Sequence, residues 1–352
     1  MAQSASGPRI LVMGCGGIGG TVAAHIAELG ADVHVVSRNT ATASAVQRNG
    51  FRLVGEGGRR TVPGRIYSEV PPGEFDLVLF ATQPTDVEGA ARQALPHLAP
   101  HGHAVILQNG LCESRVADLL GDPSRVIGGI VAWGATMPEP GVFDKTSSGG
   151  FVLGGMGGGE AAGLDLVEGL LASIGPIQRT DNLLGARWSK LALNCAVSTL
   201  GSLNGSTLGR VVRVRHARRL ALEIITEVVA VAKAAGVRLE KVSGTLDLDW
   251  IALTDAEIES GSMALAAKHA MLLAVGLRYR RLRSSMLRAI EAGKSPAIDF
   301  LNGEVVRHGT RHEVPVPLNA LVCDRVWAIS RGEVEAGPAL VARLYDETRA
   351  RL

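Results

Sequence analysis

A glycine-rich turn near the amino terminus constrains the fold of this chain more than any other feature. Residues 9–13 are a short apolar run, and Gly14, Gly16 and Gly19 follow it in G-x-G-x-x-G spacing. Small residues at 21–30 indicate a helix, and a second apolar run occupies 32–36. Strand, glycine turn, helix and strand in this order predict a dinucleotide-binding unit.

The backbone of this turn is expected to hold a pyrophosphate. Gly14 permits the tight turn, Gly16 lets the backbone approach the phosphates, and Gly19 lets the helix pack close to the strand. The helix start adds free N–H groups and the positive end of its dipole. A purely structural turn is the alternative in a chain with 44 glycines, but the surrounding elements favour cofactor binding. The predicted cofactor residues here are Gly14, Cys15, Gly16, Gly17, Ile18 and Gly19.

The tip of the second strand distinguishes between the two nicotinamide cofactors. An NAD site usually places an acid there for the ribose hydroxyls, whereas residues 37–39 contain no acid and include Arg38. A guanidinium suits a 2′-phosphate through paired, charge-assisted hydrogen bonds. We therefore predict NADP, with a solvated loop charge as the alternative for Arg38.

Strands and helices alternate through the rest of the first half. Strands are predicted at 75–81 and 103–108, a hairpin at 53–62, and a final strand within the glycine-rich stretch 149–159. A helix at 160–174 and a strand at 176–178 complete this half. The alternation predicts a doubly wound parallel sheet.

Ligands of such a sheet lie beyond the carboxyl ends of its strands. Gln83 and Asn109 follow two of the predicted strands and are predicted to contact the cofactor. Asparagine before glycine is also common in simple turns, so a structural role for Asn109 stays open.

Length and composition suggest two domains without a polyanionic partner. The chain has 352 residues, a net charge of +2 and 4% aromatic residues, which gives no argument for nucleic-acid or membrane-surface binding. Glycine turns thin out after residue 182. We predict an NADP-binding Rossmann-type domain at 1–182 and a helical substrate domain at 183–352.

Several features indicate a cytoplasmic protein. The four cysteines are far apart, so neither a metal site nor a disulfide framework is predicted. Residues 1–8 carry no apolar segment typical of a secretory signal. The apolar stretch 263–277 contains Lys268 and His269 and is too short to span a bilayer, so it indicates a buried or interfacial helix. The helix predicted at 217–235 has one apolar face, which could form core or a homodimer contact.

Three polar side chains share one helical face in residues 187–200. Lys190, Asn194 and Ser198 follow at i, i+4 and i+8 between mostly apolar neighbours. Such a stripe could offer its amine, amide and hydroxyl to a substrate. Burial lowers the pKa of a lysine, so such an amine can protonate the alkoxide left by hydride transfer to a ketone. An exposed lysine on a surface helix is the alternative, and the segment alone leaves both open.

The chain resembles the ketopantoate reductases (2-dehydropantoate 2-reductases) over nearly its whole length. The resemblance rests on the glycine motif, Gln108-Asn109-Gly110, Trp188-x-Lys190-x-x-x-Asn194, the block from Ser284-Ser285-Met286 to Ile298-Asp299-x-x-Asn302-Gly303, and Val314-Pro315-Val316-Pro317-Leu318-Asn319. It implies a Rossmann-type domain followed by an all-helical domain, with the active site between them.

The resemblance also implies roles by position. Lys190 corresponds to the catalytic general acid, Asn194 to a substrate-binding asparagine, and Asn109 to a residue bridging cofactor and substrate. Ser285 corresponds to the serine that binds the substrate carboxylate, and Arg38 to the arginine on the 2′-phosphate.

Three positions depart from the family pattern. Gln83 replaces a lysine near the cofactor, Ser198 replaces a second substrate-binding asparagine, and Ala297 replaces the glutamate that binds the substrate hydroxyl. We keep Ser198 as a predicted substrate contact. Asp299 and Glu304 could replace the lost acid, but helical spacing puts Asp299 on a different face from position 297.

The predicted function is NADPH-dependent reduction of a 2-oxo acid to a 2-hydroxy acid, with ketopantoate itself, and hence pantothenate biosynthesis, among the candidates. Ala297 supports an alternative, in which an enzyme of the same fold acts on another carbonyl or an imine in a specialised pathway. A non-enzymatic NADP-binding regulator is a third hypothesis, which retention of the polar stripe disfavours.

Overall fold

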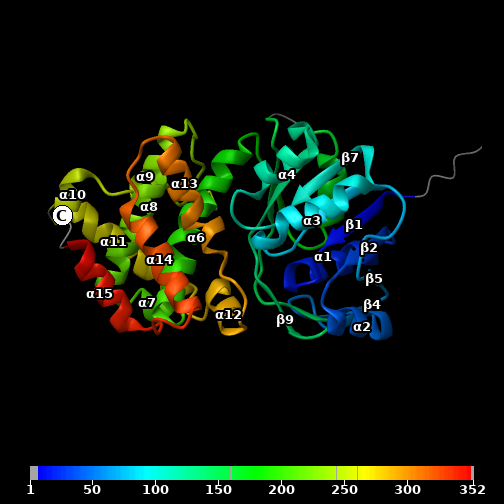
Figure 1. Cartoon of the computed structure of the whole chain (residues 1–352), viewed down its shortest axis with the longest axis horizontal. Helices are drawn as coiled ribbons and strands as arrows, with labels where there is room; N and C mark the ends of the chain where they lie inside the picture. Colours follow the sequence, from blue (N-terminus) through cyan, green and yellow to red (C-terminus); the bar gives the residue numbers. More distant parts are fainter. Residues whose placement is uncertain (1–6, 159–160, 243, 260, 350–352) are drawn as a thin grey trace, which may run out of the picture. The chain divides into compact units, whose positions relative to one another are not determined.

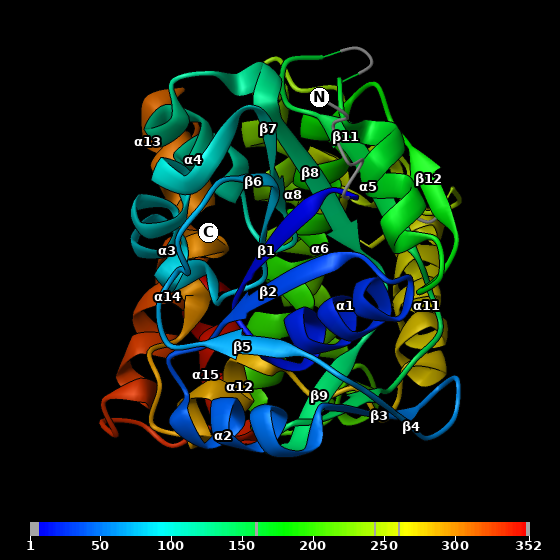
Figure 2. The ribbon, with the colours of Figure 1, turned by 90° about the vertical axis from the view of Figure 1, so that its right-hand side faces the viewer.

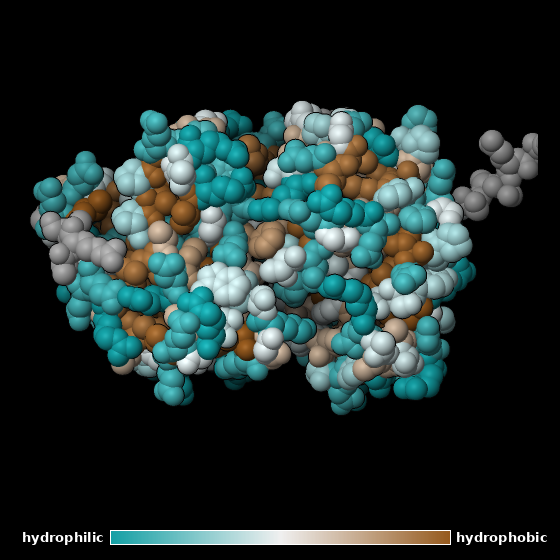
Figure 3. All heavy atoms as spheres, in the orientation of Figure 1, coloured by the Kyte–Doolittle hydropathy of each residue, from teal (hydrophilic) through white to brown (hydrophobic). Residues whose placement is uncertain are grey.

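The computed structural model describes residues 7–158, 161–242, 244–259 and 261–349. They form two compact units, one ending at Leu183 and the other beginning at Leu184 (Figure 1). Figure 3 shows hydrophilic residues over both units on the face it presents, and they separate the smaller apolar patches from one another.

An eight-stranded sheet in the order β12-β11-β8-β7-β6-β1-β2-β5 forms the centre of the first unit. Its strands are β1 (Arg9–Met13), β2 (Asp32–Val36), β5 (Arg65–Tyr67), β6 (Phe75–Phe80), β7 (Leu98–Ile106), β8 (Val126–Val131), β11 (Phe151–Gly155) and β12 (Ile177–Arg179). All neighbours from β5 to β8 run parallel, and so do β11 and β12. The pair β8–β11 is antiparallel, so at this pair the sheet departs from the predicted parallel arrangement.

Helices cover both faces of this sheet (Figure 2). On one side lie α1 (Gly17–Glu28) and α5 (Leu164–Leu171), and on the other lie α3 (Val87–Ala94) and α4 (Cys112–Leu120). The strands between them are apolar on both faces, as in β1, where Ile10, Leu11 and Val12 are fully buried. The predicted doubly wound arrangement is confirmed.

A smaller sheet, in the order β4-β3-β10-β9, packs against α1. It contains β3 (Phe51–Gly55), β4 (Arg60–Val62), β9 (Ala135–Glu139) and β10 (Val142–Lys145). The predicted hairpin is the antiparallel pair β3–β4. A Cβ atom at Gly20 would lie 2.0 Å from the ring of Phe143, so only glycine permits this contact between α1 and β10.

The second unit is helical, as predicted. Its helices are α6 (Leu183–Asn204), α7 (Leu208–Val211), α8 (Arg215–Ala234), α9 (Leu248–Ile251), α10 (Asp255–Glu259), α11 (Met263–Arg278), α12 (Ser285–Glu291), the 3₁₀ helix η4 (Ala297–Phe300), α13 (Asn302–Arg311), α14 (Pro317–Ser330) and α15 (Pro338–Arg349). Leu183, the first residue of α6, is also the last residue of the first unit.

Two buried asparagines from the family pattern connect these helices. Asn302 accepts a hydrogen bond from the Thr199 hydroxyl at 2.6 Å and donates to the Cys195 carbonyl at 3.3 Å. It also donates to Asn319 Oδ1 at 2.9 Å, and Asn319 donates to Glu227 at 2.7 Å. The network joins α6, α8, α13 and α14, so these two asparagines hold the core together.

Helix α11 buries polar as well as apolar residues, among them Leu265 and Lys268. Lys268 is buried and pairs with Glu257 at 2.6 Å, whereas Met263 at the start of the helix is 89% exposed. The Lys268 ammonium also donates to the Ala252 carbonyl, so the cation anchors the helix to its neighbours. Among the described residues, no helix combines the length and apolar character needed to cross a membrane.

Candidate active site

The predicted cofactor residues lie along one edge of the large sheet. Because β2, β1, β6 and β7 run parallel, the segments that follow them are neighbours. The Gly14 amide donates to Val36, the last residue of β2, and the Ala81 amide donates to Met13, the last residue of β1. The edge therefore carries the glycine turn, Arg38, Gln83 and Asn109.

The geometry of the glycine turn suits a pyrophosphate. Gly14 has a φ of 102°, a backbone conformation that other residues rarely adopt. A Cβ atom at Gly19 would lie 2.0 Å from the Gly14 carbonyl oxygen, whereas one at Gly16 would meet no atom within 4 Å. The turn thus leaves an open cradle above the start of α1, where helix N–H groups can receive an anion. Cys15 lies between Gly14 and Gly16. Burial raises the pKa of its thiol to about 12 and keeps the thiol protonated.

Alanine substitutions should separate the two glycine roles. We expect Gly19→Ala to lower the free energy of unfolding by about 1–3 kcal/mol because its Cβ overlaps the Gly14 carbonyl. Gly16→Ala should change that free energy by about 1 kcal/mol or less and weaken cofactor binding about 10-fold or more. Urea unfolding and titration of cofactor fluorescence measure the two effects. Unchanged cofactor affinity in Gly16→Ala would argue against a phosphate cradle.

Arg38 has an acidic partner that the sequence did not indicate. Its side chain is 72% exposed and forms an ion pair with Asp86 at 2.7 Å. Asp86 belongs to η1 (Pro84–Asp86), which follows β6, and Gln83 lies exposed just before it. The loops after β2 and β6, the two strands that flank β1, therefore bring a cation and an anion together at the tip of β2. Asn39, next to Arg38, caps the helix α2 (Thr40–Asn49).

Asn109 is exposed after β7, in the turn that leads to α4. Its carbonyl oxygen accepts a hydrogen bond from the Cys112 thiol at 3.4 Å, and Gly110 has a φ of 88°. This geometry is that of a simple Asn-Gly turn, so the structural role considered for Asn109 is present. The exposed amide is also available to a ligand, so cofactor and substrate binding by Asn109 stays a prediction.

The polar stripe of the second unit lies on α6. Lys190, Asn194 and Ser198 are all half-buried, whereas Leu191, Cys195 and Thr199, one position further along, are buried. The stripe therefore borders the accessible side of a mainly buried helix. This arrangement suits groups that contact a ligand while the helix stays fixed in the core.

Ser285 is brought next to this stripe through its neighbour Ser284. The Ser284 hydroxyl donates to the Ser198 carbonyl at 2.8 Å, lies 3.0 Å from the Ser202 hydroxyl, and caps α12 by accepting from the Leu287 amide. A Cβ atom at Gly201 would lie only 3.2 Å from Ser284, so a small residue allows the close approach. Ser284 is buried and Ser285 exposed, which leaves the predicted carboxylate ligand accessible at the helix start.

Neither acid near Ala297 is free to replace the missing glutamate. Ala297 is half-buried at the start of η4. Asp299 accepts a hydrogen bond from the Trp327 indole at 3.0 Å, and Glu304 is buried in an ion pair with Arg307. Both carboxylates have protein partners, so the position corresponding to the family glutamate is apolar.

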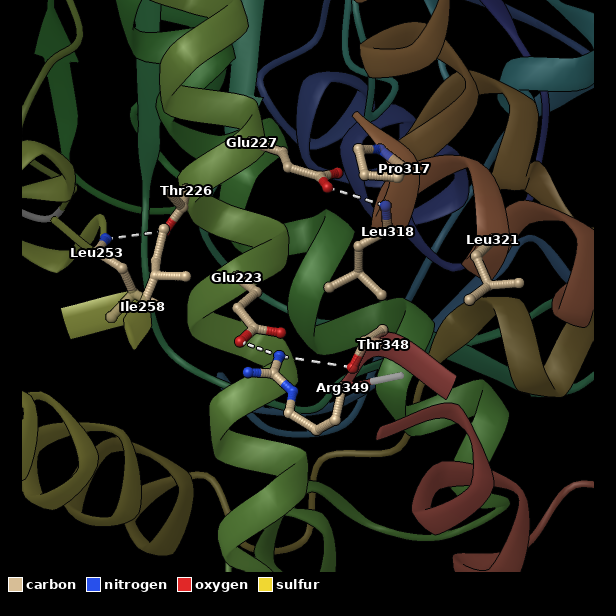
Figure 4. A pocket seen from close by; sticks show the side chains of 10 residues that line it. All are labelled: Glu223, Thr226, Glu227, Leu253, Ile258, Pro317, Leu318, Leu321, Thr348 and Arg349. Carbon is tan, nitrogen blue, oxygen red and sulfur yellow. Dashed lines mark hydrogen bonds and ion pairs between the residues drawn. The ribbon is translucent and has the colours of Figure 1, made fainter. Parts of the chain in front are cut away.

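The helical unit also encloses a cavity of about 220 Å³ away from the stripe (Figure 4). Leu253, Ile258 and Leu321 supply apolar walls, and Arg349 pairs with Glu223 at its border. Glu227 accepts hydrogen bonds from the Leu318 and Asn319 amides, both at 2.8 Å, and burial raises the pKa of its carboxyl group. These bonds hold the start of α14, so the polar groups of this cavity have structural partners.

The first unit is Rossmann-type and has a glycine turn that suits a phosphate. The second unit is helical and carries the polar stripe with Lys190. This combination is the architecture of a nicotinamide-dependent oxidoreductase. The family model "Ketopantoate reductase PanE/ApbA" matches residues 10–158, and its C-terminal counterpart matches residues 182–330. The chain belongs to the ketopantoate reductase family.

Relatives match over almost their whole length. The 2-dehydropantoate 2-reductase of Mesorhizobium japonicum is 26% identical, covering 92% of this chain and 99% of the relative. That of Pyrococcus horikoshii is 24% identical, with 94% and 98% covered.

Solved structures agree in fold. A PanE/ApbA family ketopantoate reductase from Ralstonia eutropha has a TM-score of 0.76 at 26% identity, covering 92% of this chain and 99% of the other. A ternary structure of D-mandelate dehydrogenase with NADH and anilino(oxo)acetate has a TM-score of 0.78 at 17% identity, with the same coverage. At that identity the second likeness shows the fold alone.

Proposed function

We propose that this chain catalyses the NADPH-dependent reduction of a 2-oxo acid to a 2-hydroxy acid. The observation that carries the proposal is the half-buried stripe of Lys190, Asn194 and Ser198, with Ser285 held beside it by Ser284. Membership of the ketopantoate reductase family supports the reaction type.

The residues divide the reaction between them. The reduced nicotinamide, when bound, supplies the hydride to the carbonyl carbon. Lys190 polarises the carbonyl and donates a proton to the oxygen, which leaves the product as an alcohol. Asn194 and Ser198 orient the acceptor, and Ser285 at the start of α12 binds the carboxylate. In the first unit, the turn from Gly14 to Gly19 holds the pyrophosphate.

Consumption of NADPH by the purified protein tests this function. We expect 2-oxo acids to be reduced with one product alcohol formed for each NADPH oxidised, as followed by absorbance and by mass spectrometry of the product. If none of a panel of small and bulky 2-oxo acids is reduced in either direction of the reaction, the proposal is wrong.

Cofactor choice should depend on Arg38 and Asp86. Arg38→Ala is expected to lower kcat/KM for NADPH by about 10–100-fold and to leave that for NADH little changed, because only NADPH carries the 2′-phosphate. Asp86→Asn should raise kcat/KM for NADPH a few-fold, since the ion pair at 2.7 Å competes with the phosphate. Steady-state kinetics with both cofactors measure these ratios.

Arg48→Ala is the matched control, because Arg48 is an exposed arginine in the last turn of α2, at the other end of the helix from Arg38. It should leave both cofactors unaffected. An equal loss with NADH and NADPH in Arg38→Ala would show that Arg38 does not read the 2′-phosphate.

A second candidate function follows from the apolar position 297. An enzyme of the same fold could act on a different carbonyl or on an imine in a specialised pathway. Position 297 is an alanine, which cannot hydrogen-bond the hydroxyl of ketopantoate through its side chain. Gain of ketopantoate turnover in Ala297→Glu would favour it. Efficient reduction of ketopantoate by the unaltered protein would rule it out.

A further inference from the structure

An apolar cavity of about 100 Å³ lies inside the helical unit, between α6, α7, α8 and α11. Leu193, Val197, Val212, Ile225 and Leu272 line it, and among the described residues Arg218 is the single charged one in its wall. The Arg218 guanidinium donates to the Val212 carbonyl, so the cation is held within the wall. The cavity is suited to an apolar group and offers almost no polar contact.

This cavity borders the polar stripe along α6. Val197 comes seven residues after Lys190, which places the two on nearly the same line of the helix. Leu193 lies to one side of that line, and Asn194 and Ser198 lie to the other. Leu193 and Val197 are half-buried like the polar residues. The α6 wall of the cavity, which also includes Ala196 and Leu200, therefore adjoins the predicted catalytic groups along Leu193 and Val197.

The segment that leads to Ser285 closes the same region. The Leu208 amide donates to the Leu282 carbonyl at 2.9 Å, and the Gly209 amide donates to the Arg280 carbonyl at 3.3 Å. Leu208 lines the cavity. The backbone that positions the predicted carboxylate ligand is thus bonded to one of the cavity walls.

We infer that this cavity receives the side chain of the substrate, and that the substrate is a 2-oxo acid with a branched aliphatic or aromatic side chain. The inference rests on the proposed function. When the substrate carboxylate binds Ser285 and its carbonyl binds Lys190, the substrate side chain lies along α6. The space available there is the apolar cavity. Ala297 agrees with this assignment, because it supplies no partner for a hydroxyl on the side chain.

Two 2-oxo acids of nearly the same shape provide the first test. Ketopantoate and 3,3-dimethyl-2-oxobutanoate differ only in a hydroxymethyl group in place of a methyl group. We expect the second to have a kcat/KM about 10-fold higher, and both it and phenylglyoxylate to exceed pyruvate by about 10-fold or more, because burial of a branched or aromatic group contributes that much. Higher activity on ketopantoate than on its methyl analogue would overturn the inference.

A pair of substitutions on α8 provides the second test. Ala221 lines the cavity, whereas Ala230 is exposed on the same helix. Ala221→Leu should fill the cavity and lower the ratio of kcat/KM for 3,3-dimethyl-2-oxobutanoate over pyruvate about 10-fold. Ala230→Leu should leave that ratio unchanged.

The outcomes separate the inference from the proposed function. If 2-oxo acids are reduced but the ratio is the same in both variants and the unaltered protein, the cavity does not bind the side chain while the function stands. The same conclusion follows if Ala221→Leu dissociates an oligomer, seen by light scattering, and lowers both activities equally. If no 2-oxo acid is reduced, both the function and the inference fail. Should Ala221→Leu not fold, the comparison of ketopantoate with its methyl analogue decides alone.

Discussion

Lys190→Ala is expected to lower kcat for every 2-oxo acid that the unaltered protein reduces, by about 10²–10⁴-fold. The alkoxide formed by hydride transfer needs a proton, and Lys190 is the cation of the half-buried stripe on α6. Alanine removes the proton donor and keeps the helix, because alanine has the highest helix propensity. Cofactor affinity should therefore stay close to that of the unaltered protein.

Steady-state and single-turnover kinetics measure this loss, and a pH profile adds a second readout. The activity of the unaltered protein should fall at high pH as its acid loses the proton, whereas the residual activity of the variant should lack that step. Lys233→Ala is the matched control, because Lys233 is a 61% exposed lysine in the same unit, paired with Asp249. A variant Lys190→Ala that retains more than about a tenth of kcat would exclude Lys190 as the general acid.

Asn302→Ala is expected to lower the free energy of unfolding by about 3 kcal/mol. Asn302 has no exposed surface, and its loss removes the partner of the Thr199 hydroxyl, the partner of the Asn319 amide oxygen and one hydrogen bond to the Cys195 carbonyl. Each stranded buried group costs about 1–3 kcal/mol, and relaxation of the helices recovers part of the sum.

Urea unfolding, with the slope held constant, measures this change. Asp299→Ala is the control, because Asp299 is exposed and accepts one hydrogen bond, from Trp327. It should cost about 1 kcal/mol or less. An Asn302→Ala protein of normal stability with altered substrate affinity would show instead that this family residue acts at the site.

The local sequence pattern was sufficient to predict the helices and strands that carry the candidate site. A helix from 187 to 200 followed from apolar spacing, and the structure extends it as α6 from Leu183 to Asn204. The strand predicted at 9–13 forms as β1, and the helix predicted at 21–30 forms as α1 but begins earlier, at Gly17. These features depend on hydrogen bonds and side-chain spacing within a few residues, which a sequence displays directly.

Features whose partners lie far along the chain were not predicted from the sequence. The acid beside Arg38 is Asp86, 48 positions later, and it arrives only because β6 and β2 flank β1. The antiparallel β8–β11 pair and the smaller sheet on α1 also depend on which strands meet. The sequence left residues 263–277 as a buried or interfacial helix, and only the fold shows that α11 buries Lys268, beside Glu257, while Met263 is exposed.

The sequence by itself determined the family of this protein, its division into two units and the motifs of the candidate site. These features are visible in the order and spacing of neighbouring residues. Only the tertiary structure decided which side chains are available to a ligand. Ser284, Asn302 and Asn319 are engaged in the core and Ser285 is exposed. Burial and pairing are properties of neighbours brought together by folding, and for that reason polar residues of the same type divide into buried, hydrogen-bonded groups and exposed ones.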